Sequence, residues 1–167
     1  MKSSKVVLLF LALLLCISIA SANTATYSGK VITIYSDSGQ KGGTYTSTYP
    51  IQDLDVKTNV MYISTSNMLK AVSISVPKYP VGIQSEKGNF KQAVIKNNML
   101  YAIKDGKITL YNIANKKPVY VTEYPYKSPA KTIEISGSNF YVIYDNKDRN
   151  IYSILKDGKL KILPPGV

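Results

Sequence analysis

Short apolar runs separated by turn residues follow one another along the chain from about residue 24 to its end. Runs such as KVITIY at 30–35 and KITLY at 107–111 are rich in Val, Ile, Thr and Tyr, and they are bounded by Gly, Asp, Asn or Pro. This pattern is typical of short β-strands joined by hairpin turns. No apolar run in this region keeps a helical period for three turns. We therefore predict an all-β chain.

The predicted strands recur at an interval of about 40 residues, a length that suits one β-propeller blade of four short strands. The stretch MYI at 61–63 returns as LYAI at 100–103 and as FYVI at 140–143. Two further series keep nearly the same interval, at 34–36, 71–73, 110–112 and 151–153, and at 43–46, 80–83 and 118–121. We predict a β-propeller-like domain of about four antiparallel units, at about 24–55, 56–91, 92–130 and 131–167. The first unit lacks an opening strand.

Four units leave two arrangements open, a small closed ring or an open, curved stack of sheets. An open stack would expose strand edges, which are templates for pairing with another chain. Lys159 and Lys161 discourage such pairing, and Pro164-Pro165 ends the last strand. We expect the strand at 159–163 to close on the first unit and the protein to be a monomer.

The repeated stretches VSISVPKYPVGIQ at 72–84, AVIKNNMLYAIKDGKITLYNIANKKPVYVTEYP at 93–125 and TIEISGSNFYVIY at 132–144 resemble the LVIVD-type repeat of cell-surface β-propellers. In that pattern an L-x-I-x-D-x-S strand is followed by a Pro, a Val-Gly pair and a strand with a central Tyr. The chain departs from it at Asn112, where the family usually has Asp, and at Ser73 and Ser153. The resemblance covers residues 30–163 and implies a propeller architecture in an exported setting. It implies no activity.

The first 22 residues have the features of a secretory signal peptide. Lys2 and Lys5 precede an apolar run that ends near Ile19, and Ala20-Ser21-Ala22 offers small residues at a cleavage site. The run is shorter than the roughly 20 apolar residues that a membrane-spanning helix needs, although a retained anchor is the alternative. Leu15 is a poor residue before a lipidated cysteine, so Cys16 does not indicate a lipoprotein. We expect one domain at 23–167, secreted or at the cell surface, with no membrane span after cleavage.

Charge adds a constraint on partners. The chain has a formal net charge of +11, and Arg149 is its only arginine. Bidentate recognition of bases and phosphates favours arginine, so we expect no nucleic-acid partner. Dispersed lysines fit either a solvated surface that protects sheet edges or attraction to an anionic glycan, wall polymer or lipid surface.

The residue types used most often in catalysis are scarce. The chain has no His, and its single Cys lies in the leader, so we expect no metal, no cofactor and no catalytic residue. Asp145 and Asp148 could offer oxygens to Ca²⁺, with a polar hairpin loop as the alternative. Asp53 and Asp55 could act as a carboxylate pair in hydrolysis, or lie in a solvated connection between units.

Tyrosine supplies the candidate binding residues. Exposed tyrosines on outer strands could form an apolar stacking face with polar tips for sugars or peptides, or could simply suit half-buried strands. The candidates, which lie beside prolines in two units, are Tyr120, Tyr124, Tyr126, Tyr45 and Tyr49.

Two functions remain open at this stage. The first is a non-enzymatic binding or structural module that meets an extracellular protein or an anionic surface polymer. The second is a secreted hydrolase or lyase that works on an extracellular polymer through carboxylates. An enzyme would need two or three acids on one face, whereas the acids of this chain are scattered singly. We expect the first.

Overall fold

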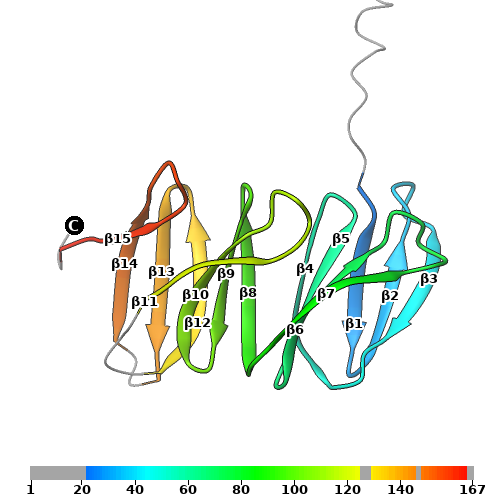
Figure 1. Cartoon of the computed structure of the whole chain (residues 1–167), viewed down its shortest axis with the longest axis horizontal. Coiled ribbons are helices and arrows are strands. Elements are labelled where there is room, and N and C mark those ends of the chain that lie inside the picture. The colour runs from blue at the N-terminus through cyan, green and yellow to red at the C-terminus, as the bar shows by residue number, and fades with distance from the viewer. Residues whose placement is uncertain (1–21, 125–128, 146–147, 165–167) are drawn as a thin grey trace, which may run out of the picture.

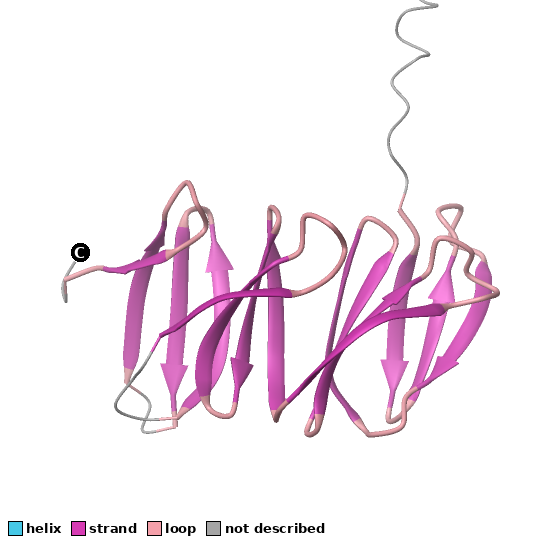
Figure 2. Ribbon diagram, viewed as in Figure 1, coloured by secondary structure: helices cyan, strands magenta, loops and turns pink. Residues whose placement is uncertain are grey.

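The structure is a computed structural model that describes residues 22–124, 129–145 and 148–164. Every regular element of these residues is a strand (Figure 2). No helix in this part of the chain is long and apolar enough to cross a membrane. The all-β prediction is therefore confirmed. The expectations for the leader, for Tyr126 and for the centre of the 145–148 loop lie outside the described residues.

The strands form four antiparallel sheets in a row along the long axis of the molecule (Figure 1). Sheet 1 contains β1 (Thr24–Ser28), β2 (Val31–Tyr35) and β3 (Lys41–Thr46). Sheet 2 contains β4 (Ile51–Lys57), β5 (Val60–Thr65), β6 (Met68–Ser73) and β7 (Val81–Lys87). Sheet 3 contains β8 (Phe90–Lys96), β9 (Met99–Lys104), β10 (Lys107–Asn112) and β11 (Val119–Tyr124). Sheet 4 contains β12 (Ala130–Ser136), β13 (Asn139–Tyr144), β14 (Arg149–Ile154) and β15 (Leu160–Ile162).

Each sheet is a meander of neighbouring strands, which is the blade predicted from the repeat. Sheet 1 has three strands where the others have four, in agreement with the missing opening strand. The sheets begin at Thr24, Ile51, Phe90 and Ala130, whereas the sequence placed the later unit boundaries at 56, 92 and 131. The largest difference concerns β4, whose Gln52, Asp53 and Asp55 make it resemble a polar connection in the sequence.

Three apolar cores lie between successive sheets and hold the row together. The core between sheets 1 and 2 contains Ile32, Ile34, Met61 and Ile63, all of them buried. The next two cores join sheet 2 to sheet 3 and sheet 3 to sheet 4. Strands such as β5 and β9 are buried along almost their whole length because alternate side chains enter different cores. Each sheet thus depends on its neighbours for burial.

The two ends of the row stay apart, so the expected closure by the strand at 159–163 is wrong. The strand β15 pairs with β14 and completes sheet 4. Sheets 1 and 4 lie at opposite ends of the long axis (Figure 1). Closure fails for a geometric reason: β15 continues the meander of its own sheet, and four sheets packed face to face carry it away from β1. The chain is an open stack.

The loop that follows the third strand of a complete sheet leans back over the preceding sheet. The loop between β10 and β11 places the carbonyl of Lys116 3.3 Å from the hydroxyl of Tyr62, which donates a hydrogen bond to it. One sheet later, the hydroxyl of Tyr101 donates to the carbonyl of Gly158, between β14 and β15, at 2.7 Å. In sheet 2 the corresponding loop lies on β3, where a Cβ at Gly43 would collide with the backbone of Pro77. A loop of the following sheet therefore contacts the preceding sheet at each junction, and at two of the three junctions a tyrosine hydroxyl donates a hydrogen bond to it.

Candidate functional site

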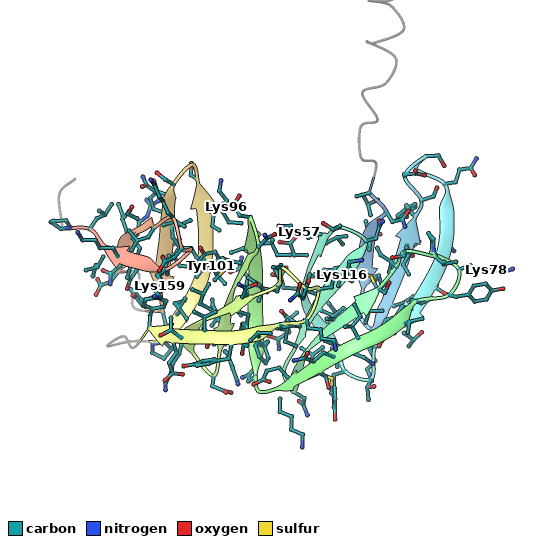
Figure 3. The ribbon with its side chains drawn as sticks, turned by 45° about the horizontal axis from the view of Figure 1, so that its top comes forward. Lys57, Lys78, Lys96, Tyr101, Lys116 and Lys159 are labelled. Atoms are coloured by element: carbon teal, nitrogen blue, oxygen red, sulfur yellow. The ribbon has the colours of Figure 1, made fainter. Side chains whose placement is uncertain are left out.

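The antiparallel meander divides the loops between two edges of the molecule. We call the edge formed by the loops after even-numbered strands, with the adjoining strand ends, the upper edge; it is at the top in Figure 1. The upper edge is rich in lysine, and Figure 3 shows several of these side chains spread along the row of sheets. They are Lys41, Lys57, Lys78, Lys96, Lys116, Lys117, Lys156 and Lys159. The acidic side chains on this edge, among the described residues, are Asp37 and Asp157.

The opposite, lower edge also carries basic side chains, but carboxylates are mixed with them. Lys104 forms an ion pair with Glu86 at 2.9 Å, and Lys107 forms one with Glu123 at 2.7 Å. Further acids here are Asp105, Asp145 and Asp148. The positive potential of the described part of the chain is therefore strongest along the upper edge.

A cavity of about 180 Å³ opens on the upper edge between sheets 3 and 4. Its apolar floor includes Met99 and Tyr101, and Lys96 and Lys156 line it from opposite sides. Asn97, which adopts a positive φ of 54°, and Asn98 add amide groups. The carboxylate of Asp157 also lines the cavity. The cavity therefore combines an apolar base with cationic, amide and carboxylate groups around it, an arrangement suited to a small polar or sugar-like group.

Two contacts order parts of this edge. The ammonium group of Lys57 donates a hydrogen bond to Oδ1 of Asn98 at 3.0 Å, which links the loops after β4 and β8. The carboxylate of Asp157 accepts a hydrogen bond from the backbone N–H of Lys159 at 3.0 Å and lies 3.1 Å from the Lys159 ammonium. The backbone hydrogen bond, followed by the contacts with the Lys159 side chain, lowers the pKa of Asp157 below its ordinary value. Asp157 thus remains charged and offsets one lysine of the edge.

The acid pair Asp53 and Asp55 lies within strand β4, not in a solvated connection. Oδ2 of Asp53 accepts a hydrogen bond from the N–H of Ala93 at 2.8 Å, and Oδ2 of Asp55 accepts one from Ile95 at 2.9 Å. Partial burial raises the pKa of both carboxyl groups, against the opposing effect of these hydrogen bonds. Both side chains are thus engaged in joining sheet 2 to sheet 3.

The structure separates the tyrosines that the sequence grouped. A β-bulge between Leu110 and Tyr111 shifts the register of β11, so that Tyr120 pairs opposite Tyr111 whereas Tyr124 pairs opposite Ile108. Tyr120 packs edge-on to Tyr111 towards sheet 2 and is 57% exposed. Tyr124 packs towards sheet 4, where its hydroxyl accepts a hydrogen bond from the N–H of Leu160 at 2.8 Å. The two rings do not share a face.

The tyrosines of sheet 1 are distant from that pair along the row. Tyr45 on β3 packs against the core between sheets 1 and 2, with the ammonium of Lys70 5.3 Å from its ring centre. Tyr49 lies in the connection to β4 and is half-buried. Tyr126 is outside the described residues. Of the tyrosines that the structure describes in this set, Tyr120 is the most accessible for a ligand.

No group of three or more Asp, Glu, His or Cys side chains in the described ranges is arranged to hold a metal ion. The carboxylates of Asp145 and Asp148 lie on the lower edge, at the turn between β13 and β14. The lysines are dispersed along the sequence, and the excess of lysine over carboxylate at the upper edge was not predicted from it. The signal was available in the strand order, since loops that follow even-numbered strands of a meander lie at one edge of the sheet and loops that follow odd-numbered strands lie at the other.

No protein-family model and no curated protein sequence matches the chain. Solved structures do match its fold. The chain aligns with the periplasmic gluconolactonase of Pseudomonas aeruginosa at a TM-score of 0.64 and 10% identity, covering 81% of this chain and 47% of that one. It aligns with the N-terminal domain of Nup159 at a TM-score of 0.58 and 12% identity, covering 89% of this chain and 42% of that one. It aligns with a functionally unknown protein from Desulfotomaculum acetoxidans at a TM-score of 0.65 and 14% identity, covering 88% of this chain and 51% of that one.

These neighbours are β-propeller-like proteins, which confirms the predicted fold class. The chain spans about half the length of each of them. They include an enzyme and a nucleoporin domain, and at identities this low the likeness concerns the fold alone.

Proposed function

We propose that the chain is an exported, non-enzymatic binding module of the β-propeller type, related to the LVIVD-type surface proteins, whose upper edge engages an anionic extracellular polymer. The observation that carries the proposal is the gathering of lysines along the upper edge. Spaced over successive sheets, these ammonium groups match the repeated charge of a linear polyanion better than that of a single small ion.

The cavity between sheets 3 and 4 and the exposed ring of Tyr120 add local contacts to this edge. Lys96 and Lys156 reach the cavity from neighbouring sheets, and the Asp157 carboxylate that also lines it is paired with Lys159. One charged unit of a polymer could therefore lie between Lys96 and Lys156. Tyr120 follows the loop that carries Lys116 and Lys117 and offers an apolar face to a sugar ring. Charge supplies attraction, and these contacts supply selectivity.

The carboxylate arrangement favours binding over hydrolysis. General acid–base work needs a carboxyl group that is free to contact a substrate. Asp53 and Asp55, the paired carboxylates of the sequence analysis, accept backbone hydrogen bonds from the next sheet instead. A carboxylate-dependent hydrolase or lyase acting on an extracellular polymer is the second candidate. It would require substrate to displace these hydrogen bonds.

The test measures binding of residues 23–167, which contain every described strand, to dextran sulfate and to neutral dextran. We expect binding to dextran sulfate only, weakening as salt is raised because exposed charges are screened. The variant K96Q/K116Q/K156Q should bind about tenfold more weakly, because each exposed ionic contact contributes about 0.2–1 kcal/mol.

The matched control removes three lysines of the lower edge, in K30Q/K87Q/K91Q, so that both variants lose the same charge. This control should retain most of the binding. Equal losses in the two triple variants would show that net charge rather than the upper edge is responsible. Release of reducing ends from an anionic polysaccharide, abolished by D53N, would favour the hydrolase instead.

A further inference from the structure

Residues on the two end faces of the stack occupy register positions whose counterparts in the internal junctions are buried. Register aligns the cross-strand pairs Tyr62–Ala71, Tyr101–Leu110 and Tyr141–Ile151 at the same place in sheets 2, 3 and 4. The first two pairs face the following sheet and are at most 1% exposed. Tyr141 and Ile151 face outward from the end of sheet 4 and remain half-buried. Sheet 4 therefore presents at its centre the same pair that receives another sheet elsewhere. Charged groups flank this pair, because Glu134 lies opposite Tyr141 and the guanidinium of Arg149 lies 4.5 Å from the Tyr141 ring centre.

The outward face of sheet 1 shows the matching half of a junction. Tyr35 stands at the register position of Tyr111 and Tyr152, whose rings are buried against the preceding sheet. Tyr35 is only partly buried, because sheet 1 is the first sheet of the row that the described residues form. Thr24, Thr26 and Thr33 are on the same face, and Lys41, the register partner of Tyr35, adds one ammonium group to it.

The loop contact is also available at this end. The β2–β3 loop has the turn geometry of the β14–β15 loop: Gly39 N–H donates to the carbonyl of Ser36 at 2.9 Å, as Gly158 donates to Leu155. Gly158 packs against Met99 and accepts the hydrogen bond of Tyr101. No atom of the described residues outside its chain neighbours lies within 4 Å of a Cβ built at Gly39, whereas a Cβ at Gly158 would collide with Met99.

We propose that two copies of this chain associate head to tail, the outer face of sheet 4 of each packing against the outer face of sheet 1 of the other. The tyrosine hydroxyl of Tyr141 then donates to a carbonyl of the β2–β3 loop near Gly39, which repeats the Tyr101–Gly158 contact across the junction. Two such junctions close eight sheets into one ring.

The second copy is the favoured occupant because both open faces belong to the same chain and differ in the same way as the two sides of its internal junctions. Sheet 1 lacks an innermost strand, so each junction buries less surface than an internal one, and the pair should dissociate on dilution.

The first measurement is sedimentation equilibrium of residues 23–167 over a range of concentrations. A reversible transition between one and two copies supports the proposal. A single copy at every concentration, or growth beyond two copies into a filament, overturns it.

Substitutions then test which faces meet. I151E on sheet 4 and T33E on sheet 1 should each raise the dissociation constant at least about tenfold, since each places a carboxylate without a partner at the centre of the junction, where it loses its hydration. An equimolar mixture of the two variants should still form a pair, because one junction keeps both native faces. V81E, on the 61% exposed Val81 of β7, is the matched control and should leave association unchanged.

An effect of only one of the two end-face variants would mean that like faces meet, and would overturn the head-to-tail arrangement. Circular dichroism of each variant checks that the sheets are intact. Y141F, which removes a hydroxyl from a half-exposed ring, is the milder second variant. It should weaken the pair and leave the stability of the single chain unchanged.

Discussion

The side-chain amide of Gln92 pairs with the peptide group of Ile133 in the next sheet. Its Oε1 accepts a hydrogen bond from the Ile133 N–H at 2.8 Å, and its Nε2 donates to the Ile133 carbonyl at 3.0 Å. Asp53 fills the same position one sheet earlier, where it accepts from Ala93. The innermost strands of neighbouring sheets form no ladder with each other, so side chains satisfy these backbone groups.

Replacing Gln92 by Ala should lower the free energy of unfolding by about 1–3 kcal/mol, because partly buried backbone groups of Ile133 lose their partners. Urea denaturation measures the change. Gln52→Ala, at an exposed position of β4, is the matched control and should cost less than about 0.5 kcal/mol. Equal effects of the two substitutions would contradict a specific role for Gln92.

The carboxyl groups of Asp53 and Asp55 should make stability depend on pH. Partial burial raises the pKa of each above its ordinary value, so the folded state binds protons more tightly than the unfolded chain. This contribution is greatest below pH of about 3.8 and is lost as pH rises through the raised pKa. The variant D53N/D55N keeps oxygen acceptors for both backbone hydrogen bonds. Relative to this variant, the wild-type chain should lose stability as the pH rises above about 3.8 and through the raised pKa values of the two carboxyl groups.

Denaturation midpoints at several pH values check this, with D157N as the control of opposite sign. The pKa of Asp157 is lowered, so its contribution is present above the unfolded pKa and is lost as pH falls. If the wild-type chain and D53N/D55N had parallel pH profiles, the burial of these carboxylates would have no energetic consequence.

Two buried tyrosines should respond in opposite ways to loss of the hydroxyl group. Tyr101 donates to the carbonyl of Gly158, and burial raises its pKa to about 12, so it remains a donor at neutral pH. Tyr101→Phe should cost about 1–3 kcal/mol, because the carbonyl is left without its partner. The hydroxyl of Tyr111 is buried with no hydrogen-bond partner in the described part of the chain. Tyr111→Phe should therefore be neutral or stabilising. Thermal denaturation of both variants measures the difference, and a larger cost at Tyr111 would contradict the assignment.

Export is a prediction of the sequence alone. Expressed with its leader in a secreting host, the chain should appear outside the cell with an N-terminus near Asn23. N-terminal sequencing of the released protein checks this. Retention of Met1 on protein held in the membrane would indicate an anchor in place of a cleaved signal.

The sequence by itself determined the all-β class, the interval of about 40 residues and the short first unit. These features depend on local composition and on spacing along the chain, as in the Tyr62, Tyr101 and Tyr141 series. The strand β4 was missed because its acids serve the next sheet, and a contact between sheets leaves no local pattern.

The tertiary structure alone decided which side chains meet. One bulge in β10 and β11 sends Tyr120 and Tyr124 to opposite faces, although their spacing predicts a common one. The pairing of β15 with β14 leaves the ends of the stack open, because closure depends on the curvature summed over four sheets. The excess of lysine over carboxylate at the upper edge likewise depends on packing, because the sheets stack in the same orientation and place their equivalent loops at the same edge. Such properties arise from packing between sheets, which the order of residues within one strand does not specify.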